Sequence, residues 1–187
     1  MIRFATKEDG PQIAPLLLVI LKDMELPFID EYGEEKTLAI LADAVSEPDY
    51  RYGYPRGIVK EIDGRIAGVA YGYTSEDEAT IDDQFKKVLL AHGIEDEIDL
   101  FTDDETFPDE WYLDSISVSE DFRGHGIGSE LLEALPKLAH KANKTRIGLS
   151  VDKENPAAKR LYERNGFKDV GEMVISGHLY DHMQKEI

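Results

Sequence analysis

The sequence predicts an α/β protein with a mixed central β-sheet of six to seven strands flanked by helices on both faces. Three observations support this prediction. The second half alternates strand and helix patterns, a glycine-rich turn joins one strand to a helix, and an Asp-Gly pair joins two strands in the first half. Such alternation is typical of a sheet covered by helices. With 187 residues, 42% of them hydrophobic, residues 1–187 are expected to form a single domain.

The first half is predicted to begin with a short strand at Ile2–Ala5. Thr6 then opens a helix that runs to about Asp23, because a hydroxyl followed three residues later by Asp is typical of an N-cap. A second helix is expected over Glu34–Ser46, where apolar residues recur at helical spacing. Residues 57–73 alternate as two strands around an Asp-Gly pair, which is a strong hairpin signal.

The segment at about 75–110 differs sharply in composition from its neighbours. Residues 76–110 hold fourteen Asp or Glu and two Lys, a net charge of 2 − 14 = −12 within a total of −18. Ile81, Phe85, Val88 and Leu89 predict one amphipathic helix there. We interpret the segment as an acidic, partly helical insertion between strands, with a lid or an oligomer contact as open roles.

The second half is predicted to contain four strands and two helices. In chain order they are a strand at Trp111–Val118, a helix from the glycine turn to about Lys141, a strand at Thr145–Val151, a helix at Pro156–Asn165, and strands at Phe167–Ile175 and His178–Met183. Pro136 lies inside the first helix, where it removes a hydrogen bond and crowds the carbonyl of Leu132. A kink is therefore predicted at Pro136.

Composition excludes several classes of function. The chain has no cysteine, so disulfides, thiolate nucleophiles and cysteine metal sites are excluded, in agreement with a cytoplasmic protein. The longest apolar run, Ile13–Leu21, is too short to span a membrane and contains Pro15, so we expect no membrane partner. The net charge of −18 argues against nucleic acid and is compatible with a cationic partner.

The glycine turn is the strongest candidate for a binding site. In FRGHGIGSELL, residues 122–132, Gly124, Gly126 and Gly128 stand directly before a helix-forming run. A helix N-terminus presents unpaired N–H groups and a positive dipole end, and glycines allow an anion to approach them. Arg123 adds a positive charge. The turn is therefore predicted to hold a phosphate-type anion, although a tight strand-to-helix connection alone would also use glycines.

Two motifs resemble those of the GNAT superfamily of N-acetyltransferases. Arg123-Gly-His-Gly-Ile-Gly128 is similar to the Arg/Gln-x-x-Gly-x-Gly/Ala signature of that family and follows a strand, LDSISVSEDF, as it does there. Asn155-PAAKRLY-ERNGF is similar to the motif that follows it in the family. The two motifs cover about Trp111 to Phe167. The resemblance implies a GNAT-like mixed sheet and acetyl-CoA as the acetyl donor.

The resemblance also implies roles for particular residues. The backbone N–H groups of the turn would bind the CoA pyrophosphate, and the strand at Ile116–Val118 would splay away from Thr145–Val151 to pair with the pantetheine. A bulged residue near Ile116 would present its N–H to the thioester carbonyl. The expected cofactor-binding residues are Ile116, Ser117, Val118, Arg123, Gly124, His125, Gly126, Ile127, Gly128, Ser129, Asn155, Ala158 and Tyr162.

Asn155 and Tyr162 are also linked by helix geometry. Pro156 favours the first helical position, which makes Asn155 the N-cap, and a separation of seven places Tyr162 on the same helix face. The resemblance implies that Tyr162 protonates the departing CoA thiolate as a general acid. The alternative is that Asn155 only caps the helix and Tyr162 only packs beside Leu161.

The acceptor side is less well defined by the sequence. Some relatives carry a glutamate base at the position of Tyr112, so that role cannot be transferred, and Asp114, two residues later on the same strand face, is our first candidate for the base. Glu105 and Glu110 are weaker candidates. Further acceptor-site candidates are Tyr71, Tyr73 and an acidic-aromatic loop with Glu25, Phe28, Asp30 and Glu31. These features favour a cationic primary amine on a small molecule or peptide.

The five histidines show no ligand spacing, so no metal is predicted; they are His92, His125, His140, His178 and His182. The predicted function is N-acetyl transfer from acetyl-CoA to a primary amine by direct attack in a ternary complex. One alternative is a non-catalytic acyl-CoA sensor or interaction module, and another is an enzyme that uses a longer acyl-CoA or an acyl-carrier protein. Edge strands near the C-terminus pair between subunits in many relatives, which is compatible with a homodimer.

Overall fold

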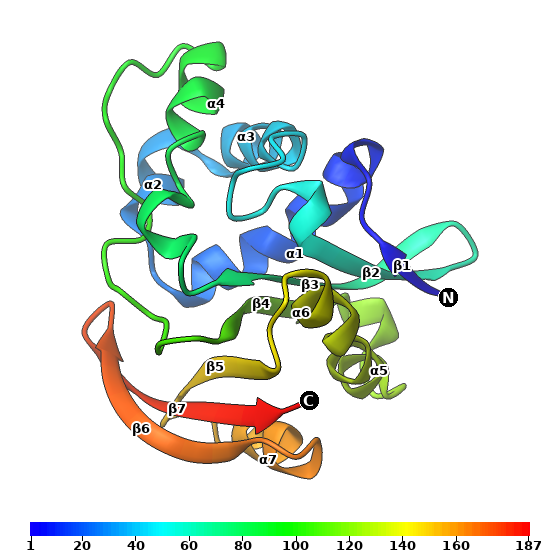
Figure 1. Cartoon of the computed structure of the whole chain (residues 1–187). Coiled ribbons are helices and arrows are strands. Elements are labelled where there is room, and N and C mark those ends of the chain that lie inside the picture. The colour runs from blue at the N-terminus through cyan, green and yellow to red at the C-terminus, as the bar shows by residue number, and fades with distance from the viewer.

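The computed structural model describes residues 1–187 and is built around one seven-stranded sheet (Figure 1). The strands are β1 (Ile2–Phe4), β2 (Gly57–Ile62), β3 (Arg65–Thr74), β4 (Trp111–Val118), β5 (Arg146–Asp152), β6 (Lys168–Ile175) and β7 (His178–Glu186). Their order in the sheet is β1-β2-β3-β4-β5-β7-β6. The β4–β5 pair is parallel and the other five pairs are antiparallel. The predicted mixed sheet is thereby confirmed.

Helices cover both faces of this sheet. They are α1 (Gly10–Asp23), α2 (Pro27–Tyr32), α3 (Glu34–Ala44), α4 (Phe85–Ala91), α5 (Ile127–Ala134), α6 (Pro136–Lys141) and α7 (Pro156–Arg164). Figure 1 shows α1–α4 on one side and α5–α7 on the other, and the two large buried apolar clusters divide in the same way. None of the helices combines the length and hydropathy that crossing a bilayer requires.

Most of the predicted elements of the first half are confirmed. The Asp9 carboxylate accepts hydrogen bonds from the Thr6 backbone N–H (2.8 Å) and hydroxyl (3.2 Å), at a 3₁₀ turn that leads directly into α1. Arg3 donates two further bonds to Asp9, and this pairing lowers the pKa of the Asp9 carboxyl. In the β2–β3 hairpin, Asp63 and Gly64 both adopt positive φ, as a two-residue turn of this type requires.

Two predictions for the helices need correction. The acidic-aromatic segment expected as a loop contains the helix α2, which Pro27 begins; Phe28 is buried there against Tyr32 and Phe85, so it belongs to the core. In the acidic insertion, the helix begins only at Phe85. At Pro136 the helix is interrupted, as the kink prediction expects: α5 ends at residue 134 and α6 begins at the proline, with Leu135 between them in helical φ and ψ.

The sheet opens between β4 and β5. These parallel strands pair only from Trp111 to Leu113, opposite Ile147 to Leu149, although both continue beyond this stretch. The predicted splay is confirmed. On the other side of β4, Tyr71 pairs with Ser115 and Gly72 with Leu113, which leaves Asp114 as the extra residue of a β-bulge. The bulge therefore lies two residues before Ile116, which pairs regularly with Ala70.

Candidate functional site

The glycine turn ends in a row of free N–H groups. The backbone N–H groups from Gly124 to Ser129 donate no hydrogen bond within the protein, and Glu130, bonded to the carbonyl of Gly126, is the first residue of α5 to do so. Gly124 and Gly126 have φ values of 79° and 78°, a backbone that side chains rarely adopt, and a β-carbon at either would meet open space. Six consecutive donors on an exposed turn form a suitable anion cradle.

The side chains of this turn contribute less than its backbone. His125 Nδ1 lies 2.9 Å from the carbonyl oxygen of Arg123, so the ring folds back onto the turn. Ile127 is buried and packs toward Gly68 in the sheet. Arg123 is exposed, with Glu120 3.7 Å away as its nearest acidic partner. Of the predicted turn residues, we therefore expect Arg123 alone to offer a charged side chain to an anion.

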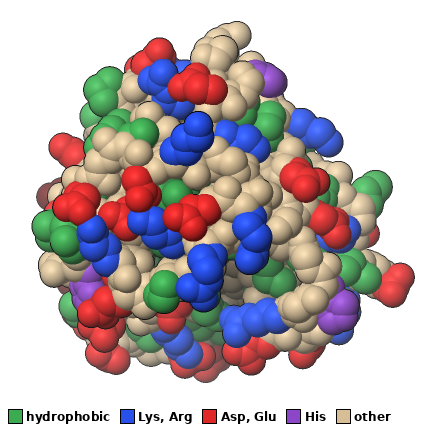
Figure 2. All heavy atoms as spheres, turned by 90° about the horizontal axis from the view of Figure 1, so that it is seen from below, with side chains coloured by type: hydrophobic (Ala, Val, Ile, Leu, Met, Phe, Trp, Pro, Cys, Tyr) green, Lys and Arg blue, Asp and Glu red, His purple; other side chains and the backbone are tan.

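A basic surface lies next to the turn, on and around α7. Residues 153–168 carry five Lys or Arg and two Glu. Lys153 and Lys159 are paired with carboxylates of β6 and β7, so the exposed cations without an acidic partner are Arg160, Arg164 and Lys168. Figure 2 shows the face below β6, β7 and α7, where Lys and Arg side chains gather around a hollow. At the start of α7, the Asn155 side chain accepts a hydrogen bond of 3.1 Å from the N–H of Ala158, which confirms the predicted N-cap.

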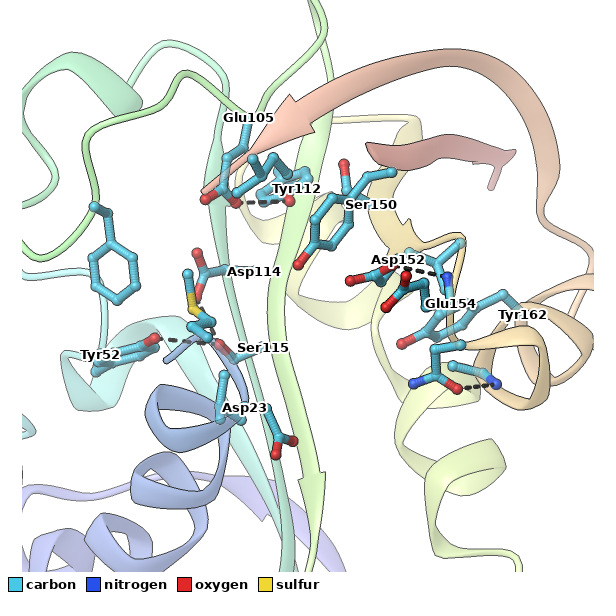
Figure 3. Close-up of a pocket in the computed structure, with 18 residues that line it drawn as sticks. Asp23, Tyr52, Glu105, Tyr112, Asp114, Ser115, Ser150, Asp152, Glu154 and Tyr162 are labelled. Atoms are coloured by element: carbon cyan, nitrogen blue, oxygen red, sulfur yellow. Dashed lines mark hydrogen bonds between the residues drawn. The ribbon is translucent and has the colours of Figure 1, made fainter. Parts of the chain in front are cut away.

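The split between β4 and β5 continues into a cavity of about 420 Å³ (Figure 3). Five carboxylates line it, and no Lys, Arg or His does. The carboxylates are Asp23, Glu105, Asp114, Asp152 and Glu154. A smaller cavity of about 140 Å³ lies within the split itself, and Asp114, Ser115, Ser150 and Tyr162 line both. A cation would find only acidic and neutral partners there.

Tyr162 lies where the two cavities meet. Its side chain is buried, it packs edge-on against Phe167 with ring centroids 6.1 Å apart, and it lines both cavities. Burial raises the pKa of the Tyr162 phenol to about 12, so the hydroxyl keeps its proton at neutral pH. The geometry therefore presents a proton donor at the junction, as the predicted role requires.

Asp114 is held by a buried arginine. Its carboxylate pairs with Arg51, and it also accepts a hydrogen bond of 2.8 Å from the Ser115 hydroxyl. Arg51 makes two further bonds to Asp82, of 2.9 and 3.0 Å, and its guanidinium lies 4.1 Å from the Phe101 ring centroid. The charge of Asp114 is thus already balanced. This arrangement anchors the bulge of β4 to the acidic insertion and leaves Asp114 less free to act as the base.

Glu105, from the end of the insertion, also lines the cavity, on the same side as Asp114 (Figure 3). It accepts a hydrogen bond of 2.8 Å from the Tyr112 hydroxyl, as Figure 3 shows. Burial, reinforced by the nearby charge of Asp114, raises the pKa of the Glu105 carboxyl to about 7. The turn that carries Glu105 is fixed by Glu78, whose carboxylate accepts from the backbone N–H groups of Glu105 (2.7 Å) and Thr106 (3.1 Å).

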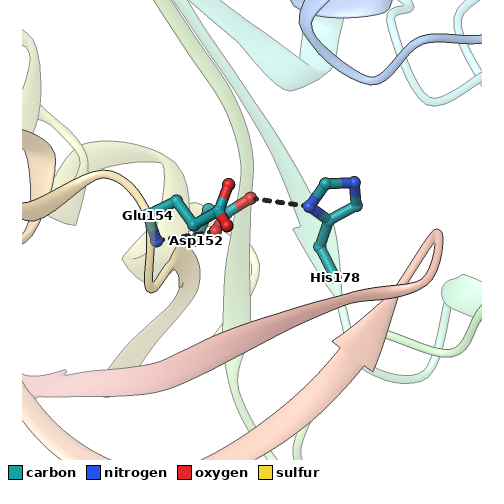
Figure 4. A group of neighbouring side chains, drawn as sticks. All are labelled: Asp152, Glu154 and His178. Carbon is teal, nitrogen blue, oxygen red and sulfur yellow. Dashed lines mark hydrogen bonds and ion pairs between the residues drawn. The ribbon is translucent and has the colours of Figure 1, made fainter.

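The cavity meets solvent at the exposed Glu154, and we call this part its mouth. Asp152, Glu154 and His178 lie together there (Figure 4). One ligand atom from each lies within 4.8 Å of the others, and His178 Nδ1 is 3.6 Å from Asp152. Histidine spacing in the sequence does not predict this group, because β5 and β7 bring it together. Glu154 and His178 are exposed, and Asp152 already accepts from the Glu154 N–H at 2.8 Å, so we interpret the group as surface ion pairing.

Several residues of the site are not evident from the sequence. Arg51 lies in an irregular segment before β2, and Ser150 and Asp23 carry no motif, yet all three lie at or beside the cavity. The expected acceptor residues are not all there: Tyr71 is a core residue, and Glu25, Asp30 and Glu31 are exposed outside the cavity. In the sequence Arg51 stands between Tyr50 and Tyr52 and belongs to no motif, so no signal was available for it.

The chain resembles known proteins over its whole length. A solved structure of an acetyltransferase is 56% identical, covers 100% of this chain and 98% of its own, and has a TM-score of 0.92. An N-acetyltransferase from Staphylococcus aureus Mu50 is 26% identical, covers 99% of this chain and 100% of its own, and has a TM-score of 0.84. The fold is also shared with yncA of Salmonella typhimurium, solved with acetyl-CoA, at 21% identity and a TM-score of 0.61, covering 100% of this chain and 92% of its own.

Among curated proteins, the spermine/spermidine N(1)-acetyltransferase of Bacillus subtilis (strain 168) is 39% identical over 67 residues. The match spans 35% of this chain and 44% of that protein. The sequence model of the acetyltransferase (GNAT) family matches residues 19–167, a range that contains the glycine turn, the split strands and Tyr162. The chain therefore belongs to the acetyltransferase (GNAT) family.

Proposed function

We propose that the protein is an N-acetyltransferase that moves an acetyl group from acetyl-CoA to a primary amine of a cationic acceptor, by direct attack in a ternary complex. The observation that carries this proposal is the junction at Tyr162. There, the opening between β4 and β5 meets a cavity lined by five carboxylates and by no basic side chain. The opening between β4 and β5 suits an acyl donor, and the acidic cavity suits an ammonium group.

The donor side fits acetyl-CoA. The six free N–H groups from Gly124 to Ser129 would hold its pyrophosphate, and the basic surface around α7 would attract its other phosphate. The edge of β4 beyond Leu113 has no strand partner on the β5 side, so it would pair with the pantetheine amides. When bound, acetyl-CoA supplies an acetyl group that is already activated as a thioester.

The reacting groups would meet beside Asp114 and Tyr162. The bulge at Asp114 interrupts the pairing of β4 with β3 and so turns backbone groups of the strand away from the regular ladder. We assign to a backbone N–H of this bulged segment, between Asp114 and Ile116, the stabilisation of charge on the carbonyl oxygen. Tyr162, protonated at neutral pH, would donate its proton to the departing sulfur.

The acceptor side favours an amine with more than one positive charge. Figure 3 shows Glu105 and Asp114 on one side of the cavity and Asp152 and Glu154 on the other; the first pair is buried and the second is more exposed. Tyr52, Phe101 and other aromatic side chains line the walls between them. Acidic groups separated by apolar walls suit a flexible diamine or polyamine, which is also the substrate class named for the Bacillus subtilis relative.

The test is calorimetric titration with acetyl-CoA, followed in the same sample by release of free CoA thiol with a panel of amines. The panel contains a polyamine, a diamine, a monoamine, an aminoglycoside, a free amino acid and a lysine peptide. We expect tight binding of acetyl-CoA and fastest turnover with the polyamine. Binding without turnover on any amine would favour a non-catalytic acyl-CoA sensor, and no binding would contradict the assignment of the turn.

A pair of double variants tests the charge of the cavity mouth. Asp152→Asn with Glu154→Gln should raise KM for the polyamine about threefold to tenfold, with an effect that shrinks at high salt. Asp30→Asn with Glu31→Gln removes the same charge from an exposed site outside the cavity and serves as the matched control. Equal effects of the two pairs would indicate only a general field of the acidic protein.

A further inference from the structure

A buried hydrogen-bonded chain runs from the floor of the cavity into the protein. Ser150 Oγ on β5 lies 3.0 Å from His182 Nδ1 on β7, and His182 Nε2 lies 3.0 and 3.1 Å from the two carboxylate oxygens of Glu110. Both His182 and Glu110 have side chains that are 0% exposed. Of the three hydrogen-bonded residues, only Ser150 is therefore not fully buried.

The surrounding donors fix the protonation of this chain. The Glu110 carboxylate also accepts bonds from the Gln184 side-chain amide (2.7 Å) and from the Phe107 backbone N–H (2.8 Å). Two of the three neighbours of Glu110 are fixed donors, so we assign Glu110 as the anion and place the proton of a neutral His182 on Nε2. With this assignment His182 Nδ1 carries the lone pair and can accept a hydrogen bond from the Ser150 hydroxyl.

The ring of His182 is held in place by packing on both sides. Phe107 stacks on it with centroids 3.9 Å apart, and Tyr112 lies parallel to it with centroids 6.0 Å apart. The Glu110 carboxylate lies directly against Gly148 on β5, where any β-carbon would overlap it. The position of each member is therefore determined by the surrounding structure, which is typical of a group that must act in one geometry.

Ser150 opens at the junction where the reacting groups would meet. It lines both the main cavity and the small cavity within the β4–β5 split, together with Tyr162. Asp114 lines both as well, but its charge is balanced by Arg51. Glu105 lines only the main cavity. Two groups at the junction could lead a proton away from the acceptor, namely Asp114 and Ser150. Asp114 is paired with Arg51, whereas Ser150 has no charged partner on the cavity side.

We propose that Ser150, His182 and Glu110 form a proton relay that deprotonates the acceptor ammonium; this inference rests on the proposed acetyl transfer. The ammonium gives one proton to Ser150 Oγ while the Ser150 hydroxyl gives its own to His182 Nδ1. The products are a neutral amine, an unchanged serine and an imidazolium paired with the Glu110 carboxylate. Ser150 is the catalytic residue of the relay; His182 holds the proton, and Glu110 positions His182 and balances its charge.

The relay keeps its hydrogen bonds in both protonation states. With neutral His182, the Ser150 hydroxyl donates to Nδ1 (3.0 Å). With the imidazolium, Nδ1–H donates to Ser150 Oγ, and the hydroxyl can turn to Met173 Sδ, which lies 3.3 Å away. Neither state leaves a buried polar atom unpaired, so transfer of the proton does not disrupt the local structure.

The decisive experiment compares two acceptors in the wild type and in Ser150→Ala. One acceptor is the best amine of the panel, and the other is its fluorinated analogue, whose amine has a lower pKa and is largely unprotonated in solution. Ser150→Ala should lower kcat about 30-fold to 100-fold with the first acceptor and less than threefold with the second. KM for acetyl-CoA should stay within twofold, since the turn and the β4 edge are unchanged.

His182→Gln and Glu110→Gln should show the same selective loss, and calorimetric binding of acetyl-CoA reports whether each remains folded. Should these two variants fail to fold, Ser150→Ala still decides, because it removes a single hydroxyl. His140→Gln, on the exposed end of α6, is the control for a histidine change and should keep full activity.

Three outcomes would overturn the relay. Equal losses with both acceptors would indicate a structural role for Ser150, and wild-type rates in Ser150→Ala would exclude any role. A selective loss in Glu105→Gln, with none in Ser150→Ala, would instead make Glu105 the base. Failure of the proposed function would give a different result, because the wild type itself would release no CoA thiol with any amine. The relay proposal would then fall together with the proposed function.

Discussion

The two sides of the site are built in opposite ways. The glycine turn is one stretch of six residues that uses its backbone; its first three residues are exposed, and its free N–H groups make no contact with distant segments. The acidic cavity is assembled from the end of α1, the acidic insertion, β4, β5 and α7, and it uses side chains. A local backbone site can be recognised from a motif, whereas a cavity of this kind requires the fold.

The largest effect is expected where the two sides meet. Tyr162→Phe keeps the packing against Phe167 but removes the proton donor, so kcat should fall about 10²-fold to 10³-fold. Acetyl-CoA affinity should change less than twofold. Steady-state kinetics and calorimetry measure the two quantities, and Tyr54→Phe outside both cavities is the control. An unchanged kcat would remove Tyr162 from the chemistry and leave it a packing residue of the junction.

A second prediction concerns the cavity side alone. The pKa of Glu105 is raised from 4.5 to about 7, so the folded protein holds this proton more tightly than the unfolded chain. The free energy of unfolding therefore falls as pH rises from about 4.5 to about 7, by a contribution on the order of 3 kcal/mol. Glu105→Gln keeps an acceptor for the Tyr112 hydroxyl and should remove this loss.

Urea denaturation at pH 5 and pH 8 measures the effect. Glu105→Gln should be more stable than the wild type at pH 8, and the difference should nearly vanish at pH 5. Glu25→Gln, an exposed residue, is the control for the loss of one charge. A gain of the same size at both pH values would show that burial does not perturb the carboxyl.

The smallest effect is predicted for the turn, and it has a close control. Gly126 and Gly64 both have positive φ, and in both a β-carbon would meet open space. Ala at either position should cost about 1 kcal/mol of stability. Only Gly126→Ala places a methyl group beside the free N–H groups, so it alone should weaken acetyl-CoA binding, about tenfold. Equal affinities in calorimetry would mean that the anion does not approach the turn at Gly126.

The sequence was sufficient to predict the order of strands and helices because each signal is local. Hairpin residues, the Thr6–Asp9 cap, Pro136 and Asn155 act within a few residues, and the structure agrees at each of them. The helix α2 was missed because Phe28 is surrounded by acidic residues that mimic a loop, whereas tertiary burial of this one ring stabilises the six-residue helix.

The candidate site was predictable only in part. The turn, Asn155 and Tyr162 were identified from motifs, and Asp114 and Glu105 were proposed from their position near the central strand. Nothing in the sequence pairs Arg51 with Asp114, 63 residues away, or His182 with Glu110, 72 residues away. Such contacts depend on sheet register and on the path of the insertion, so they could be read only from the folded chain.

The missing side chain at Gly148 has an evolutionary consequence. The Glu110 carboxylate occupies the volume that a β-carbon at position 148 would need. A relative with a larger residue at this position cannot keep the glutamate in the same place, and a relative that loses the glutamate no longer requires glycine. The two positions should therefore change together among descendants of a common ancestor, and their joint presence would mark the branch of the family that inherited this buried histidine.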